Sequence, residues 1–579
     1  MDELIAADPA GELSDDLIAA ILEEAGKFAT DEIAPQNWIG DQAGVSLVDG
    51  RVITPDGWAD LYRRWREGGW NALAAPVEHG GQGLPTTVNV ACLEMWNAAA
   101  MSFAIGSLLT IGAIEALHAH GSDELKRVYL DKLVSGEWMG TMNLTEPQAG
   151  SDLNALRSRA ERMPDGTYRI FGQKIYITYG EHDFTDNIVH LVLARLPDAP
   201  AGTRGISLFV VPKFLVNADG SLGARNDVKC VGLEHKLGLH ASPTCTMQYG
   251  DAGGAVGYLV GEENRGLACM FTMMNNARLG VATQGVAIAE RAYQKALAFA
   301  KERKQGRAPG YTGEGMSPIV QHPDVKRMLL EMRAKTAAAR ALCLMTAKAL
   351  DLAHLEKTPE ARAAAHHRAS LLTPIAKAFA TDIGIEVASL GVQVHGGMGF
   401  IEETGAAQHL RDARILAIYE GTNGIQAIDL VTRKLPLEGG AVVKGFIAEL
   451  RTDLAAVRAS NESGLGSTAD WVKDAIDALE GATDWMLEAV KTRPTDALAG
   501  ATPYLRLFAL AAGGVALSKK ALAAARAITT GEGDAQTNGL RMATARFFAA
   551  NLATAAQGLS ASVTEGAESV STAFTDAAA

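Results

Sequence analysis

Glu420 stands out in the stretch LAIYEGTNGIQAIDLVTRKL, residues 416–435, because its neighbours are mostly apolar. The apolar residues recur at helical spacing, yet Gly421 follows Glu420 and permits a bend. A carboxylate at such a bend either faces water or is held in an apolar pocket. In a pocket its pKa rises toward neutrality, and the carboxylate becomes a stronger proton acceptor. From these residues alone, a solvated helix carboxylate is the simpler interpretation.

Three other stretches could bind a flat or phosphorylated ligand. MNLTEPQAGSD, residues 142–152, is expected to lead from helix into strand, and its glycine and hydroxyls can present polar groups to a ring or a phosphate. VQVHGGMGF, residues 392–400, follows a helix, so it does not match the dinucleotide fingerprint. KIYITYGEHD, residues 174–183, predicts a strand with Tyr176 and Thr178 on one face. Each has a plain alternative: an interdomain loop, a helix-ending turn and ordinary strand packing.

Several other kinds of chemistry find no support in the sequence. The histidines do not cluster with cysteines or carboxylates at metal spacing, so we expect no metal, and neither GxSxG nor a P-loop occurs. The five cysteines are scattered without a CxxC pair, which favours a reducing compartment. The net charge of -14 argues against nucleic-acid binding, and an anionic substrate would need local arginines or helix N-termini.

The chain is also expected to act away from membranes. Its N-terminus, MDELIAADPAGELSDD, is acidic and resembles neither a signal peptide nor a transit peptide. The apolar run LFALAAGGVAL is about half of the ~20 residues that a spanning helix needs. We therefore expect a cytoplasmic protein with no membrane partner.

The motifs lie on a chain that changes pattern twice, from helix to strand and back to helix. Residues 1–140 show helical spacing, 141–261 show the two-residue period of strands, and both 262–435 and 436–579 are helical again. Helices and strands that are separated along the chain predict an α+β protein with separate domains rather than a wound βαβ sheet.

In their order along the chain, these stretches resemble the acyl-CoA dehydrogenase family. LTEPQAGSD is similar to one family signature, QVHGGMGFIEETGAAQHLRDARI to a second and IYEGTNGIQ to the catalytic segment. The resemblance implies an N-terminal helical domain, a central β-barrel-like domain and a C-terminal four-helix bundle. The extra helical domain, residues 436–579, resembles a larger bacterial branch of the family. Asn143 and Tyr176 depart from the family pattern, which usually has a small apolar residue or cysteine, and often tryptophan, at these places.

The resemblance implies an FAD-dependent oxidation of an acyl-CoA to a trans-2-enoyl-CoA. Glu420 would remove the α-proton while its backbone N–H holds the thioester oxygen beside Gly421, and a hydride would pass from the β-carbon to flavin N5. The expected FAD contacts are Met142, Leu144, Thr145, Ser151, Tyr176, Thr178 and Thr422, with Arg303, Gln305, Gln393 and Gly397 from a neighbouring subunit. Ser151 and Arg278 would also lie at the acyl-CoA site.

The same resemblance implies an electron-transfer flavoprotein as acceptor and a homo-oligomer, with a dimer expected. Two alternatives stay open: an acyl-CoA oxidase on the same fold, which passes electrons to oxygen, and a catalytically silent helical scaffold. The acyl group cannot be inferred from the sequence, because pocket depth depends on side chains that the sequence does not place.

Overall fold

The computed structural model describes residues 1–8 and 11–573, which form two compact units. The N-terminal unit is Glu12–Gly280, and the C-terminal unit is Val281–Ala579 together with Met1–Gly11. Residues 9–10 of the predicted 1–140 domain and 574–579 of the predicted 436–579 domain lie outside the described residues. The division into four domains inferred from the sequence, with boundaries near residues 140, 261 and 435, stays a prediction.

The N-terminal unit opens with helices and one small hairpin. Ser14 caps the first of these helices by accepting a 3.2 Å hydrogen bond from the Leu17 N–H, and two aspartates follow in the first turn, where carboxylates are favourable. The elements are α2 (Asp15–Phe28), α3 (Ala34–Ala43), β1 (Ser46–Val48), β2 (Arg51–Ile53), α4 (Trp58–Glu67), α5 (Thr86–His120), α6 (Asp123–Leu125), α7 (Asp131–Val134) and the beginning of α8 (Gly266–Glu302).

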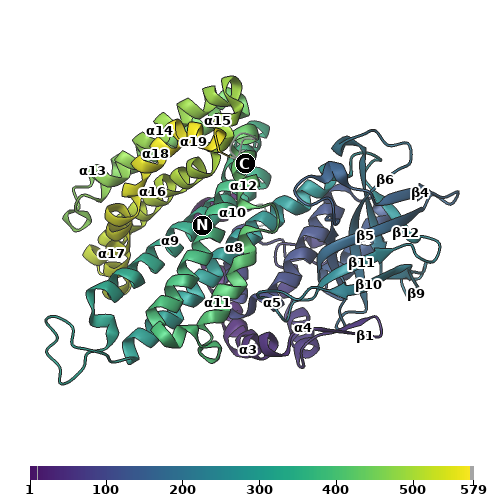
Figure 1. The fold of residues 1–579 in the computed structure, drawn as a ribbon, viewed down its shortest axis with the longest axis horizontal. Helices are drawn as coiled ribbons and strands as arrows, with labels where there is room; N and C mark the ends of the chain where they lie inside the picture. Colours follow the sequence, from purple (N-terminus) through teal and green to yellow (C-terminus); the bar gives the residue numbers. More distant parts are fainter. Residues whose placement is uncertain (9–10, 574–579) are drawn as a thin grey trace. The chain divides into compact units, whose positions relative to one another are not determined.

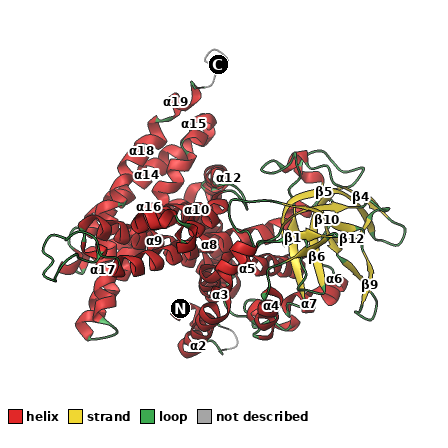
Figure 2. Ribbon diagram, turned by 60° about the horizontal axis from the view of Figure 1, so that its bottom comes forward, coloured by secondary structure: helices red, strands yellow, loops and turns green. Residues whose placement is uncertain are grey.

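A sheet of eight strands forms the rest of the described N-terminal unit (Figure 2). Its order is β10-β11-β5-β12-β7-β6-β3, and β4 pairs with both β5 and β6. Strands β5, β12, β7, β6 and β4 therefore form a closed ring. This closure gives the barrel-like domain that the family resemblance implied. The strands are β3 (Trp138–Asn143), β4 (Arg159–Arg162), β5 (Tyr168–Thr178), β6 (Asn187–Arg195), β7 (Ile206–Pro212), β10 (Val228–Leu233), β11 (Thr244–Tyr249) and β12 (Ala255–Val260), with β8 (Phe214–Val216) and β9 (Leu222–Arg225) as a separate hairpin.

Strand β3 corrects one expectation from the sequence. It begins at Trp138, inside the region expected to be helical, and residues 144–152 follow it as a loop, so the expected helix-to-strand order around MNLTEPQAGSD is wrong. β3 pairs parallel to β6, and all but one of its residues are buried. A parallel strand buried on both faces lacks the two-residue alternation that identifies a strand in sequence.

The C-terminal unit is helical throughout its described part. Thr358 caps α10 by accepting a 3.2 Å hydrogen bond from the Ala361 N–H, and Pro359 stands at the first helical position. The helices are α1 (Asp2–Ala7), the rest of α8, α9 (Pro323–Leu355), α10 (Pro359–His395), α11 (Ala406–Ala413), α12 (Asn423–Asp429), α13 (Ala441–Ala459), α14 (Thr468–Thr492), α15 (Pro494–Ala499), α16 (Ala501–Thr530), α17 (Ala535–Asn551), α18 (Ala556–Glu565) and α19 (Ala567–Ser571).

Within this unit, α16 is the central helix of the C-terminal extension. Helices α13, α14, α17 and α18 pack around it, and α16 also packs against α9, α10 and α12 (Figure 1). The extension therefore contacts α12, the helix that begins directly after the Glu420 bend, as well as α9 and α10.

Among the described residues, α5 and α16 are long and apolar enough to cross a membrane by length and composition alone. Their most apolar windows are 89% and 78% buried inside the protein, respectively. A helix that is apolar all round is buried in a protein core or in a membrane, and here the protein covers most of both helices.

Candidate active site

The bend predicted at Glu420 is present in the C-terminal unit. Residues 414–417 form a short 3-10 helix, the backbone leaves helical geometry, and α12 begins only at Asn423. Glu420 has a φ of 54° and Gly421 a φ of 84°. The left-handed conformation costs a non-glycine residue about 1–2 kcal/mol, so other contacts must hold Glu420 in it.

Tyr419 anchors one side of this bend. Its hydroxyl donates a hydrogen bond to Oε1 of Gln284, a fully buried residue of α8. Burial, and to a smaller extent the charge of Glu420, raises the pKa of Tyr419 well above its usual value. The hydroxyl therefore stays protonated and remains a hydrogen-bond donor to Gln284.

Two buried side chains hold the other side of the bend. The Lys377 ammonium, fully buried on α10, donates to the Gly421 carbonyl at 2.8 Å and to Asn423 Oδ1 at 3.0 Å. The Gln426 Nε2 donates to the Glu420 carbonyl at 3.2 Å. These bonds occupy the carbonyls of the two positive-φ residues. Neither Lys377 nor Gln426 was predicted from the sequence, where the only signal is a lysine inside the apolar run PIAKAFA.

In the N-terminal unit, a buried ion pair shapes the loop after β3. Lys174 on β5 pairs with Glu146 at 2.8 Å and also donates to the Leu144 carbonyl at 3.0 Å. Burial acts to raise the pKa of Glu146, but the Lys174 charge and the N–H groups of Arg157 and Ser158 outweigh it and lower the pKa. The Ile175 N–H donates to the Thr145 carbonyl at 2.9 Å, which brings Thr145 beside Tyr176.

Tyr176 is presented to solvent by a β-bulge. Between the pairs Ile177–Cys245 and Lys174–Met247, two residues of β5 oppose one of β11, and Tyr176 adopts a φ of 60° there. Its side chain is 60% exposed, whereas Ile177 is buried and Thr178 half-buried. An exposed aromatic ring held by a strained bulge is suited to stack on a planar ligand.

Asn143 is buried inside the β domain. Its side chain is fully buried between Tyr249, whose hydroxyl donates at 2.8 Å, and Thr141, which accepts at 2.8 Å. Met142 and Leu144 alternate with it along the strand and are half-buried on the opposite face. The departure from the family pattern at Asn143 therefore lies within a polar network inside the β domain.

The remaining predicted residues fall into two groups. Ser151 is exposed in the loop after β3, and Arg278 is buried on α8, where it donates to Asn275. In the C-terminal unit, Phe299 and His395 stack at 4.5 Å, which brings the end of α8 to the end of α10. The exposed residues near these two ends are Arg303, Gln305, Gln393 and Gly397. Thr422 caps α12 by accepting a 3.3 Å bond from the Ile425 N–H.

Family models match nearly the whole chain. Residues 16–137, 141–252 and 264–435 match the N-terminal, middle and C-terminal domains of acyl-CoA dehydrogenase, and 444–573 match the acetyl-CoA dehydrogenase C-terminal-like domain. The 3-methylmercaptopropionyl-CoA dehydrogenase of Ruegeria pomeroyi is 51% identical over 92% of this chain and 89% of its own length. A butyryl-CoA dehydrogenase of Syntrophomonas wolfei is 38% identical over 76% of this chain and 73% of its own.

A solved structure shows the same fold over the extension as well. The acyl-CoA dehydrogenase of Bacillus anthracis complexed with FAD has a TM-score of 0.76 and 22% identity, covering 96% of this chain and 89% of that one. The comparisons confirm the α+β fold with its extra helical region, the oxidoreductase activity on an acyl-CoA and the FAD cofactor expected from the sequence. The chain belongs to the acyl-CoA dehydrogenase family.

Proposed function

We propose that Glu420 is the general base of this acyl-CoA dehydrogenase. The observation that carries the proposal is the left-handed backbone of Glu420, which is bracketed by the hydrogen bonds of Tyr419, Lys377 and Gln426. Strained backbones persist where the surroundings over-determine them, and such sites are often functional. Tyr419 stays protonated and donates to Gln284, so it does not compete with Glu420 as a proton acceptor.

The base acts on a carbon acid that a carboxylate in water deprotonates poorly. Two properties of the chain would close this gap. The Glu420 N–H would donate to the thioester oxygen and stabilise the charge that develops there. An apolar pocket for the acyl group would raise the pKa of Glu420 and strengthen it as an acceptor. FAD, when bound, supplies the acceptor for the hydride from the β-carbon.

The described side chains fit an FAD. Tyr176 offers an exposed ring, and Met142 and Leu144 offer a half-exposed apolar face next to Thr145. We infer that these residues and Thr178 hold the ring system, that Ser151 lies near the pyrophosphate or the CoA entry, and that Arg278 lies at the acyl-CoA. The groups assigned to the diphosphate and adenosine side are Arg303, Gln305, Gln393, Gly397 and Thr422.

We propose a short thioether acyl-CoA, 3-methylmercaptopropionyl-CoA, as the substrate. The 51% identity to the Ruegeria pomeroyi dehydrogenase over most of both chains supports this choice. We further propose that electrons leave through an electron-transfer flavoprotein, that the protein works as a homodimer and that it acts in the cytoplasm.

A panel of acyl-CoAs tests the substrate. We expect 3-methylmercaptopropionyl-CoA to give a higher kcat/KM with a dye acceptor than straight-chain acyl-CoAs from butyryl to decanoyl. A clear preference for one of the straight chains would contradict the substrate assignment but not the activity. Hydrogen peroxide formed at the rate of substrate oxidation would instead favour an acyl-CoA oxidase, and a protein that oxidises no acyl-CoA would favour the silent scaffold.

A further inference from the structure

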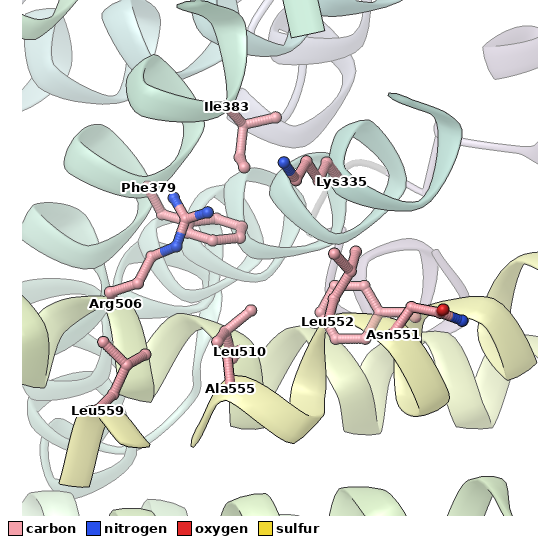
Figure 3. A pocket seen from close by; sticks show the side chains of 10 residues that line it. Lys335, Phe379, Ile383, Arg506, Leu510, Asn551, Leu552, Ala555 and Leu559 are labelled. Atoms are coloured by element: carbon pink, nitrogen blue, oxygen red, sulfur yellow. The ribbon is translucent and has the colours of Figure 1, made fainter. Parts of the chain in front are cut away.

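A small cavity of about 230 Å³ lies between the bundle helix α10 and the C-terminal extension. Phe379 and Ile383 of α10 face Arg506 and Leu510 of α16 across it, and Figure 3 shows the Arg506 guanidinium over the ring of Phe379. The distance from the Arg506 guanidinium carbon to the ring centroid is 5.0 Å. The cavity walls are mostly apolar, and Lys335 supplies a second cation.

Carboxylates of the protein already match both cations. Arg506 binds the two oxygens of Glu386 at 3.0 and 3.1 Å, and Lys335 binds Glu386 at 2.7 Å and Glu331 at 2.6 Å. Glu331 also pairs with Arg327, which in turn pairs with Asp324, so three cations and three carboxylates leave no excess positive charge for an anionic ligand. The arginine therefore connects α16 to α10, and a bidentate arginine–carboxylate pair fixes the relative geometry of two elements.

One helical turn before Glu386, Asp382 connects the same face of α10 to the Glu420 segment. Burial raises the pKa of Asp382, while its hydrogen bond from Asn423 and the charge of Arg506 act in the opposite direction. The Asn423 Nδ2 donates to Asp382 at 2.7 Å. The charge of Glu386 acts with burial, and the pKa of Asp382 is raised overall. Arg506 favours the ionised carboxylate through its own charge and by pairing with Glu386.

Asn423 also connects Asp382 to the bend at Glu420 through Lys377. Its Oδ1 accepts from Lys377 at 3.0 Å, and the same ammonium donates to the Gly421 carbonyl at 2.8 Å. The charge of Lys377 also acts on Asp382, so the three groups form one network. Helix α12, which begins at Asn423, packs directly against α16.

We propose that Lys377, Asp382 and Asn423 are positioning residues for Glu420, and that the C-terminal extension acts on catalysis through Arg506. This inference rests on the proposed role of Glu420 as the base. Without the network, Glu420 relaxes from its left-handed backbone toward commoner conformations and its carboxylate moves away from the α-carbon. A misplacement of about 1 Å costs roughly 10²-fold in rate.

The test compares arginine variants of the FAD-loaded enzyme. Arg506→Met removes the charge, and Arg506→Lys keeps it. Arg368→Met is the matched control, because Arg368 also joins α10 to the extension, through Glu449 and over the Phe446 ring at 5.6 Å, about four turns before Asp382. The readouts are the limiting rate of substrate-dependent flavin bleaching, the substrate dissociation constant, the FAD content and the Tm.

We expect Arg506→Met to slow bleaching about fivefold with nearly unchanged substrate affinity, and Arg506→Lys to recover most of the rate. Arg368→Met should bleach at the wild-type rate. Lys377→Met should slow bleaching by about 10²-fold while keeping its FAD. If Lys377→Met does not fold, the Arg506 variants decide alone, since the Arg506 side chain is 25% exposed and its replacement is tolerable.

Two results would overturn the inference. One is an Arg506→Met enzyme with the wild-type bleaching rate, and the other is an equal loss of rate and Tm in Arg506→Met and Arg368→Met, which would show general weakening. A Glu420→Gln variant separates the base assignment from the positioning inference. If Glu420→Gln bleaches normally, the base assignment fails; if it is inactive while Arg506→Met is unaffected, only the positioning inference fails.

Discussion

Glu420 and Tyr176 share an unusual backbone, since both are non-glycine residues with positive φ, 54° and 60°. One is the proposed base and the other the proposed stacking ring. Glu420 lies at the break before α12, and Tyr176 lies at the bulge of β5. In both cases the positive φ gives the side chain a direction that a regular helix or strand would not give it. Six other described non-glycine residues also have a positive φ, so the conformation alone does not identify a functional residue. At Glu420 and Tyr176 it accompanies a proposed chemical role.

Tyr176→Ala tests the stacking role. Because the side chain is 60% exposed, its removal should leave the fold and the apo-protein Tm nearly unchanged. Loss of an aromatic contact should weaken FAD binding by about tenfold. Fluorescence titration of apo-protein with FAD measures the affinity, with Tyr176→Trp as the variant that keeps it. Equal FAD affinity for Tyr176→Ala and wild type would remove Tyr176 from the site.

At the scale of elements, the close contact of α8 with α10 positions the base segment. A Cβ at Gly285 would lie 2.3 Å from the Ala380 carbonyl oxygen, so only glycine permits this approach. Gln284, the neighbour of Gly285, accepts the hydrogen bond from the Tyr419 hydroxyl. Lys377, which binds the Gly421 carbonyl, lies on α10 three residues before Ala380. The helix pair therefore brings together both groups that hold the bend.

Gly285→Ala should push α8 and α10 apart and destabilise the protein by about 1–3 kcal/mol. Gly445→Ala and Gly481→Ala are matched controls in α13 and α14, because a Cβ at either place meets no atom within 4 Å. These controls should be neutral or stabilising by about 0.5–1 kcal/mol. Thermal unfolding measures all three. A Gly285→Ala protein as stable as its controls would contradict the packing argument.

How far the sequence predicted this arrangement depends on the range of the interactions. The bend at Glu420 was predictable because Gly421 is its immediate neighbour, and the runs of Val, Ile, Leu and Phe that predict β5, β6 and β7 are local as well. Lys377 was not predictable: a lysine in an apolar helix can also extend to solvent, and only Asn423, 46 residues away, shows that it is buried and bonded. The start of strand β3 was missed because Trp138, Met139 and Gly140 form no run of β-branched residues, and its pairing partner β6 lies far along the chain.

At the scale of the whole molecule, the residues assigned to the diphosphate and adenosine side of FAD suggest a second subunit. Arg303, Gln393 and Gly397 are exposed in the single chain. Apolar side chains beside Gly397 are exposed too: Phe400 is 85% exposed and Met398 49%. Exposed apolar clusters next to binding residues commonly mark interaction surfaces, which favours the proposed dimer.

Phe400→Arg should weaken that dimer and lower its FAD content together. Light scattering gives the mass in solution, and absorbance gives the flavin per chain. Val570→Arg is the control, because Val570 is also exposed, at 60%, but lies in α19 of the extension. A wild-type protein that is monomeric and fully loaded with FAD would refute the dimer, whereas a tetramer would correct only its size.

The most direct test of the central claim is the flavin bleaching of Glu420→Gln with 3-methylmercaptopropionyl-CoA or another good acyl-CoA under anaerobic conditions. The change is nearly isosteric, so folding and FAD content should stay at wild-type levels. Loss of a positioned proton acceptor should slow bleaching by at least about 10²–10⁴-fold, so the variant stays yellow while the wild type bleaches. Bleaching of Glu420→Gln at a rate near that of the wild type would show that another group takes the α-proton and that Glu420 is not the base.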